Sequence, residues 1–192
     1  MTTTTRATPK LLTAAEFAAL GDIGRAELIR GRVVHLTRPK PKHGRVAQNI
    51  AYSLESHVRP RRLGQVYGSE IGYVAERDPD TVRAPDVSFV RPEVADAHDE
   101  AEWYPHGPDL AVEVVSPTDA APEVDEKVAM WLASGSRSVW VVDPQRRSGR
   151  IHRPAGAVEQ VDQGGLLQDQ AVLPGFSMTL REALDGAEAP PA

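Results

Sequence analysis

Two acidic residues lie in or beside apolar segments, where carboxylates are uncommon. Glu113 stands in the middle of residues 109–115, in which nearly every other position is apolar, a pattern typical of a central strand covered on both faces. Asp86 follows Pro85 and comes directly before residues 87–90, so we expect it where a second strand begins. A buried carboxylate is costly unless a cation or hydrogen-bond donors compensate it.

On neighbouring strands these two carboxylates would form a cation site, because Mg²⁺ is commonly held by one or two carboxylates while it keeps several waters. The alternative for Glu113 is a structural ion pair or a strand end in solvent. Successive strand residues point to opposite faces, so Glu113 should share a face with Ala111 and Val115, opposite Leu110 and Val112.

Lys127 is the third candidate. It lies in a helix predicted from Pro122 to Ser134, three residues after Val124 and four before Trp131, at the border of the apolar stripe. Its side chain can extend past the sheet edge into water. Alternatively, it reaches back to the carboxylates, where an ammonium would stabilise a developing oxyanion or orient an attacking water.

Several other chemistries are disfavoured. The chain has no cysteine, which excludes disulfides, thiolate metal sites and cysteine nucleophiles. It contains no phosphate-binding loop, dinucleotide turn, nucleophile elbow or zinc-binding HExxH helix, and no two histidines lie three or four residues apart. Ser116 and Thr118 fit a turn better than they fit nucleophiles. With only 5% aromatic residues, a sugar-stacking glycosidase cleft is improbable.

The sequence pattern predicts that the elements positioning these residues form a single α/β domain over residues 11–185, with a mixed sheet flanked by helices. Flexible tails are expected at 1–10 and 186–192, where the composition cannot support a core. A long acidic loop is expected at 91–108. The expected elements are helices at 14–20, 44–58 (ended by Pro60) and 122–134, a hairpin at 26–30 and 32–36, strands at 65–75, 86–90, 109–115 and 138–143, and C-terminal antiparallel strands at 150–153, 157–161 and 166–172.

Charge is unevenly distributed along the chain. The total of 22 Lys and Arg against 27 Asp and Glu gives −5, yet residues 1–65 hold 12 basic and 4 acidic residues. A local basic surface attracts polyanions whatever the net charge, so this segment predicts a phosphate-contacting surface, unless its charges are dispersed. Its candidate residues are Arg38, Lys40, Lys42, Arg45, Arg59, Arg61 and Arg62. No apolar run is long enough to cross a bilayer and the N-terminus does not look like a signal peptide, so we expect a soluble cytoplasmic protein.

The chain resembles the Uma-type family of endonucleases in the PD-(D/E)XK, or restriction-endonuclease-like, superfamily. The similarity runs from about residue 11 to 184, and the order and spacing of its motifs carry it more than any single motif. These motifs are Glu27-Leu-Ile-Arg-Gly31, the helix-opening His43, Pro85-Asp86, Leu110-Ala-Val-Glu113-Val-Val-Ser116-Pro117, Asp125-Glu-Lys127, Trp140-Val-Val-Asp143-Pro144 and Leu173-Pro-Gly175-Phe.

The resemblance implies a restriction-endonuclease-like fold and Mg²⁺-dependent hydrolysis of phosphodiester bonds, with Mn²⁺ as a possible substitute. It implies that Asp86, Glu113 and the carbonyl of Val114 hold the metal, and that Glu27 is an additional acidic residue near it. One feature departs from the superfamily pattern, because Val115 stands where a lysine is expected two positions after Glu113. The resemblance implies that Lys127 takes over that role from the next helix, where it would position or deprotonate the attacking water or stabilise the pentavalent transition state.

The implied substrate is DNA. The residues expected to contact DNA lie at or just before the start of the predicted helix and are His43, Gln48, Arg45 and Lys42. For His43, a helix cap is an equal alternative. A homodimer is implied because two copies related by a two-fold axis cut both strands of a duplex most simply. The alternative function is a nuclease-like scaffold that no longer cuts and binds nucleic acid or protein, a hypothesis that the absent strand lysine favours.

Overall fold

The central element is a six-stranded mixed sheet with the strand order β10-β9-β8-β7-β6-β3. The computed structural model describes residues 10–156 and 158–186. Only β7 and β8 are parallel, and a helix, α4 (Ala121–Ala133), connects them. The strands are β3 (Gln65–Gly68), β6 (Val87–Val90), β7 (Leu110–Val114), β8 (Ser138–Asp143), β9 (Ser148–His152) and β10 (Val158–Val161).

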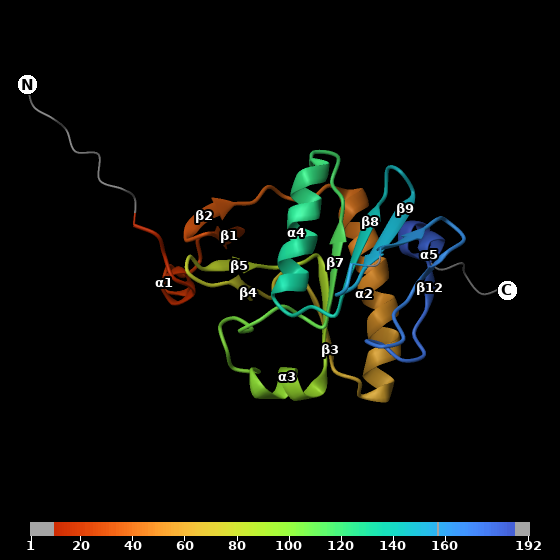
Figure 1. The fold of residues 1–192 in the computed structure, drawn as a ribbon, viewed down its shortest axis with the longest axis horizontal. Helices are drawn as coiled ribbons and strands as arrows, with labels where there is room; N and C mark the ends of the chain where they lie inside the picture. Colours follow the sequence, from red (N-terminus) through yellow and green to blue (C-terminus); the bar gives the residue numbers. More distant parts are fainter. Residues whose placement is uncertain (1–9, 157, 187–192) are drawn as a thin grey trace, which may run out of the picture.

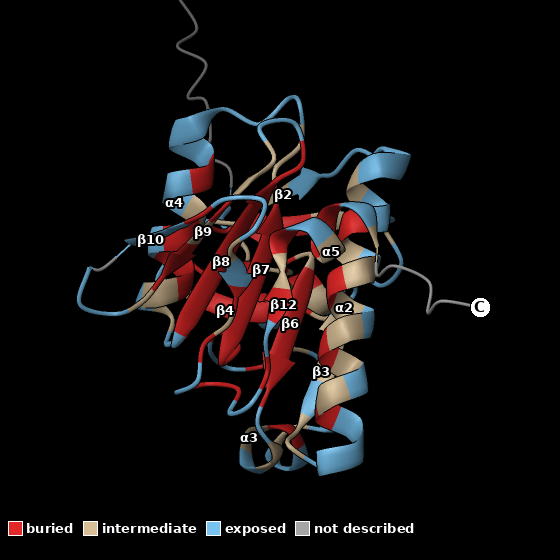
Figure 2. Ribbon diagram, turned by 90° about the vertical axis from the view of Figure 1, so that its right-hand side faces the viewer, coloured by how far each residue is buried: buried red, intermediate tan, exposed pale blue. Residues whose placement is uncertain are grey.

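The two faces of this sheet are covered by different helices (Figure 1). The helix α4 lies on one face, whereas α2 (Pro41–Arg61) and α5 (Leu180–Asp185) lie on the other. Strand β7 is buried at every position because both faces are covered, as Figure 2 shows for the centre of the sheet. Leu110 and Val112 pack towards α2, and Ala111 packs towards α4, so the predicted alternation is confirmed.

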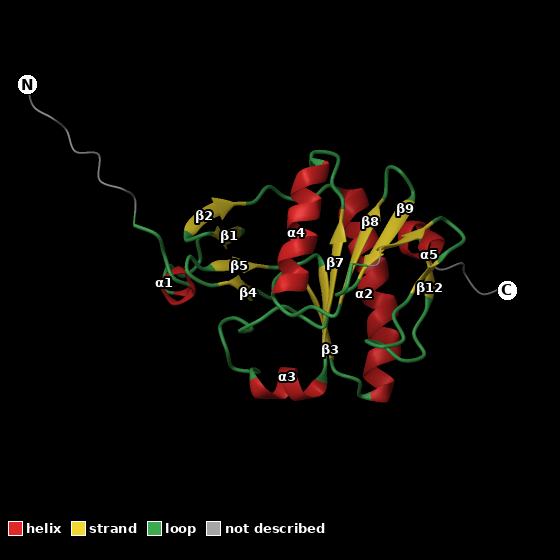
Figure 3. Ribbon diagram, viewed as in Figure 1, coloured by secondary structure: helices red, strands yellow, loops and turns green. Residues whose placement is uncertain are grey.

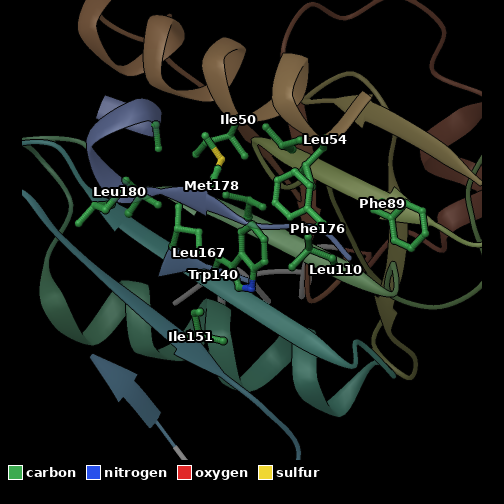
Figure 4. Packing of buried hydrophobic residues seen from close by; sticks show 14 of the residues in the cluster. Ile50, Leu54, Phe89, Leu110, Trp140, Ile151, Leu167, Phe176, Met178 and Leu180 are labelled. Carbon is green, nitrogen blue, oxygen red and sulfur yellow. The ribbon is translucent and has the colours of Figure 1, made fainter. Parts of the chain in front are cut away.

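The main core fills the space between the sheet and α2. The helix buries Val46, Ile50, Leu54 and Val58, which recur every four residues as an amphipathic helix requires. Opposite them, Trp140 of β8 stacks on Phe176 with ring centroids 6.1 Å apart, and Figure 4 shows this contact between α2 and the sheet. The core therefore fixes α2, including its first turns, against β6 and β7.

A second sheet of four strands packs beside α4, with the order β2-β1-β5-β4. A short helix, α1 (Ala14–Ala18), covers its outer face, where Phe17 joins Leu28, Val74 and Val82. The strands are β1 (Ala26–Ile29), β2 (Arg32–His35), β4 (Tyr73–Glu76) and β5 (Thr81–Arg83). The N-terminal hairpin was predicted, but its participation in a separate sheet with β4 and β5 was not.

The structure confirms the α/β fold class and corrects several elements (Figure 3). The predicted strand 65–75 is two strands, because the chain leaves the six-stranded sheet after Gly68 and enters the other sheet at Tyr73. The predicted end of the second helix at Pro60 was wrong, since Pro60 lies within the last turn of α2 and Arg62, with a φ of 53°, terminates it. Pro41 occupies the first turn, where its missing N–H costs nothing.

The remaining corrections concern short elements. The predicted loop 91–108 contains α3 (Pro92–Ala97), and the predicted strand 166–172 shortens to β11 (Leu166–Leu167), which pairs with β12 (Met178–Thr179). The helix α5 was missed. The predicted tails lie outside the described residues except for Lys10 and Gly186. Among the helices of the described ranges, none is both long enough and apolar enough to cross a membrane.

Candidate active site

The antiparallel pairing of β6 with β7 brings the two candidate carboxylates together. Val87 pairs with Val112, so one further step in this register places Asp86 opposite Glu113. A cleft opens here with two connected parts: a larger chamber of about 540 Å³, between this end of the sheet and the start of α2, and a smaller chamber of about 250 Å³, towards the second sheet. Asp86 and Lys127 line both chambers.

Glu113 is buried, and each of its carboxylate oxygens is contacted by one donor from α4. Its Oε2 lies 3.0 Å from Lys127 Nζ, and its Oε1 accepts a hydrogen bond of 2.7 Å from Trp131 Nε1. Burial raises the pKa of this carboxyl above its ordinary value, although the charge of Lys127 opposes the shift. Lys127 and Trp131 are one helical turn apart, so both donors come from the same face of α4.

Lys127 therefore reaches back to the carboxylates rather than into solvent, although its side chain remains 30% exposed. Burial is the largest single effect and lowers its pKa, but the charge and hydrogen bond of Glu113, together with the charge of Asp86, outweigh it, so the pKa lies above its ordinary value. As an ammonium, the side chain can donate hydrogen bonds and stabilise negative charge.

Asp86 is held from two sides. Its Oδ2 accepts a hydrogen bond of 2.8 Å from the backbone N–H of Val114 and lies 3.2 Å from His43 Nε2. This contact raises the pKa of His43, whose Nδ1 is buried without a hydrogen-bond partner among the described residues. His43 thus contacts a candidate metal ligand. The sequence suggests two other roles for His43, a helix cap and a phosphate contact, and neither includes this contact with Asp86.

The oxygen donors of the cleft suit Mg²⁺. Asp86 Oδ1 accepts no hydrogen bond within the described residues, and each oxygen of Glu113 keeps a lone pair beyond its one contact. The carbonyl of Val114 points to the same side of the extended strand as its N–H, which faces Asp86. Two carboxylates and a carbonyl form the all-oxygen set that this ion accepts. In the described part of the chain, no group of three or more His, Asp and Glu residues is arranged to hold a metal.

Glu27 has a different partner from the one that the resemblance implies. Its Oε2 accepts a hydrogen bond of 2.9 Å from Arg83 Nε, and both side chains are largely buried. They line the smaller chamber together with Glu113 and Lys127. Sequence reasoning did not single out Arg83; the available signal was an arginine three residues before Asp86, in a segment that becomes a short buried strand.

The predicted nucleic-acid residues are only partly brought together. Gln48 lines the larger chamber with His43, but Arg45 does not, and Lys42 Nζ donates to the carbonyl of Pro144, 2.8 Å away. Arg25, which sequence reasoning did not select, lines both chambers.

The basic residues of the first third do not form one surface. Arg38 and Lys40 line the larger chamber at the start of α2. Arg59, Arg61 and Arg62 lie at its other end, about 27 Å away at 1.5 Å per residue. The prediction of a single phosphate-contacting surface was therefore wrong for the second group, because a helix of 21 residues separates charges that are close in the sequence.

The central parallel strands of the mixed sheet are joined by α4. Paired carboxylates lie at one end of the sheet, and α4 supplies a lysine beside them. Together with the family match given below, this arrangement is that of a nuclease-like α/β protein. A crystal structure of a protein from Anabaena variabilis, described as "a putative nuclease belonging to DUF820", has the same fold: the TM-score is 0.78 at 19% identity, over 93% of this chain and 99% of that chain. No curated protein matches the chain. The profile of the Uma2 family, described as "Putative restriction endonuclease", matches residues 14–181. The chain belongs to the Uma2 family.

Proposed function

We propose that this protein is a Mg²⁺-dependent endodeoxyribonuclease, with Mn²⁺ as a substitute ion. The observation that carries this proposal is the 3.0 Å contact of Lys127 Nζ with Glu113, beside Asp86 in one open cleft. A lysine from α4 thereby stands beside the acidic residue whose own strand lacks one. Membership of a family described as "Putative restriction endonuclease" supports the same reaction class.

In the proposed reaction, water attacks the phosphorus and the bond from phosphorus to a sugar oxygen breaks. The attacking water gives up a proton to solvent and the departing sugar oxygen takes one up, which leaves a phosphate monoester and a hydroxyl group. Asp86, Glu113 and the Val114 carbonyl would hold the ion, which supplies Lewis-acid chemistry that polarises the phosphodiester and activates water. The backbone N–H of Val114 orients the Asp86 carboxylate, and Trp131 orients that of Glu113. Both carboxylates are thus fixed before substrate binds, which reduces the reorganisation that the reaction requires.

Lys127 contributes positive charge to this reaction. Since its pKa is raised, it remains protonated and can hydrogen-bond the phosphate as negative charge accumulates in the transition state. Arg38 and Lys40 in the larger chamber are placed to contact neighbouring phosphates. The ammonium of Lys127 lines the cleft beside both carboxylates, and that placement is the feature that favours the enzyme over the binding module.

Cleavage assays test the proposal. Purified protein is incubated with plasmid and single-stranded DNA in Mg²⁺, Mn²⁺ or chelator, alongside Glu113→Gln and Lys127→Met, which preserve side-chain size. Glu100→Gln and Lys10→Met, at exposed positions, make the same chemical changes away from the cleft. We expect metal-dependent cleavage that both cleft variants abolish and both controls retain. Equal cleavage by all five proteins indicates a contaminant and refutes the assignment.

Two further expectations remain predictions. A homodimer would place two clefts on the two strands of a duplex, and light scattering or ultracentrifugation measures it directly. A cytoplasmic location follows only from the sequence composition, and fractionation of cells that express the protein tests it.

A further inference from the structure

The Glu27–Arg83 pair is a cross-strand contact between β1 and β5. Leu28 pairs with Val82, so the residues on either side of this pair, Glu27 and Arg83, are neighbours on one face of the second sheet. Leu28 and Val82 point to the opposite face, where they pack under α1. Both residues of the ion pair line the smaller chamber.

Arg83 is buried but only partly used by Glu27. Its side chain is 16% exposed, and that of Glu27 is 7% exposed. Nε donates to Glu27, whereas the two terminal nitrogens donate no hydrogen bond within the described residues. Neither terminal nitrogen is among the completely buried, unpartnered atoms of the described chain, so both are accessible to solvent. A guanidinium fixed at Nε thus presents its outer donors to whatever enters.

These donors face the proposed reaction centre. Asp86, Glu113 and Lys127 line the same 250 Å³ chamber as Arg83. Arg83 is also close enough to Lys127 that its charge works against protonation of the lysine, although the pKa of Lys127 remains raised by Glu113. Two cations, from a helix and from a separate sheet, thus converge beside two carboxylates.

A phosphate group suits this arrangement better than a metal ion does. A metal near Glu27 would lie beside the guanidinium, which repels it and already occupies one carboxylate oxygen. A phosphate, by contrast, accepts two parallel hydrogen bonds from the planar fork of an arginine. Because Glu27 neutralises only one charge and engages only one nitrogen, the remaining donors stay available to an anion.

We propose that Arg83 is a catalytic residue that binds the scissile phosphate from the side opposite α4, and that Glu27 is a positioning residue for Arg83 rather than a metal ligand. This proposal rests on the nuclease function proposed above. It assigns the second sheet a role in the reaction, because β1 and β5 bring a fixed guanidinium to the carboxylates of β6 and β7.

The test uses the double variant Glu27→Gln/Arg83→Met, which leaves no buried charge unpaired and so avoids the main cause of misfolding. Arg153→Met/Asp169→Asn is the matched control, since this pair, 2.8 Å apart, has a similarly buried acid but lies outside both chambers. Cleavage kinetics, Mn²⁺ binding by calorimetry and urea unfolding are measured for both variants and for Glu27→Gln alone.

We expect the cleft double variant to bind Mn²⁺ as the wild type does, with kcat reduced by roughly 100-fold or more and a smaller change in KM. A purely structural pair would instead change stability in both double variants and leave kcat intact. Glu27→Gln alone should retain Mn²⁺ affinity, because in this proposal Glu27 is not a metal ligand. The amide oxygen of Gln would still accept a hydrogen bond from Arg83 and keep it in place. If Glu27→Gln weakens Mn²⁺ binding by about tenfold or more, Glu27 is a metal ligand and the proposal is overturned.

A separate measurement distinguishes failure of this proposal from failure of the nuclease function. If the wild type cleaves no DNA, binding of thymidine 3′,5′-bisphosphate, followed by tryptophan fluorescence, tests the phosphate site without catalysis. We then expect Glu27→Gln/Arg83→Met to bind this probe about tenfold more weakly than the wild type and the control. Equal binding by all three proteins, or none by the wild type, overturns the role of Arg83.

Discussion

Replacing Lys127 by Met should destabilise the protein by about 3 kcal/mol, because it leaves the Glu113 carboxylate buried without a cation. Removing one partner of a buried ion pair costs roughly 3–5 kcal/mol, and the lower end applies since the Lys127 side chain is 30% exposed and water can enter. For a chain of this size, that loss lowers Tm by about 6–12 °C. Adding Glu113→Gln should reduce the loss to roughly 1 kcal/mol, since Trp131 still donates to the amide oxygen and no charge remains.

The loss should also depend on pH. The pKa of Glu113 is raised in the folded state above its ordinary value of 4.5. Protonation of Glu113 therefore favours the folded state, and this contribution to the free energy of unfolding is fully present below pH 4.5. It is lost as pH rises through the folded pKa. Without Lys127 the folded pKa rises further. The destabilisation by Lys127→Met is therefore largest at about pH 8 and shrinks towards about pH 5.

Urea unfolding followed by circular dichroism, with chelator present, measures both effects for the two single variants and the double variant. Lys10→Met serves as the control for loss of a lysine. A loss below about 1 kcal/mol at pH 8, or one that does not shrink on acidification, would show that Glu113 does not depend on Lys127.

Three further predictions concern the donor to Glu113, the cleft surface and a buried histidine. Trp131→Phe removes the 2.7 Å hydrogen bond to Glu113, so we expect it to cost roughly 1.5–3 kcal/mol in urea unfolding and to reduce cleavage. Lys40→Ala should weaken DNA binding and lower the slope of log affinity against log salt by about one, whereas Arg61→Ala, at the far end of α2, should change neither in fluorescence anisotropy. Burial lowers the pKa of His152, so stability should fall as pH drops from its ordinary pKa of 6.5 to the lower folded value. His152→Gln should flatten that part of the profile of urea midpoint against pH, and an unchanged profile would contradict the assignment.

Local patterns in the sequence were sufficient for much of the fold. The spacing of Val46, Ile50 and Leu54 predicts a helix with one buried face, and alternation around Glu113 predicts which residues share its face. Pro60 misled the prediction of a helix end, because the chain keeps helical geometry for one residue beyond the proline and Arg62, in the αL conformation, terminates the helix. Pairing partners were harder, since the segment 65–75 reads as one strand but supplies two sheets.

By itself, the sequence determined that two carboxylates end up in costly apolar surroundings and that Lys127 borders the buried face of a helix. Both conclusions follow from periodicity, which depends only on neighbouring residues. Only the tertiary structure decided where Lys127 points, that His43 contacts Asp86 and that Glu27 pairs with Arg83. These contacts join residues 14 to 56 positions apart, and the packing and pairing of elements that bring them together are not encoded by any local pattern.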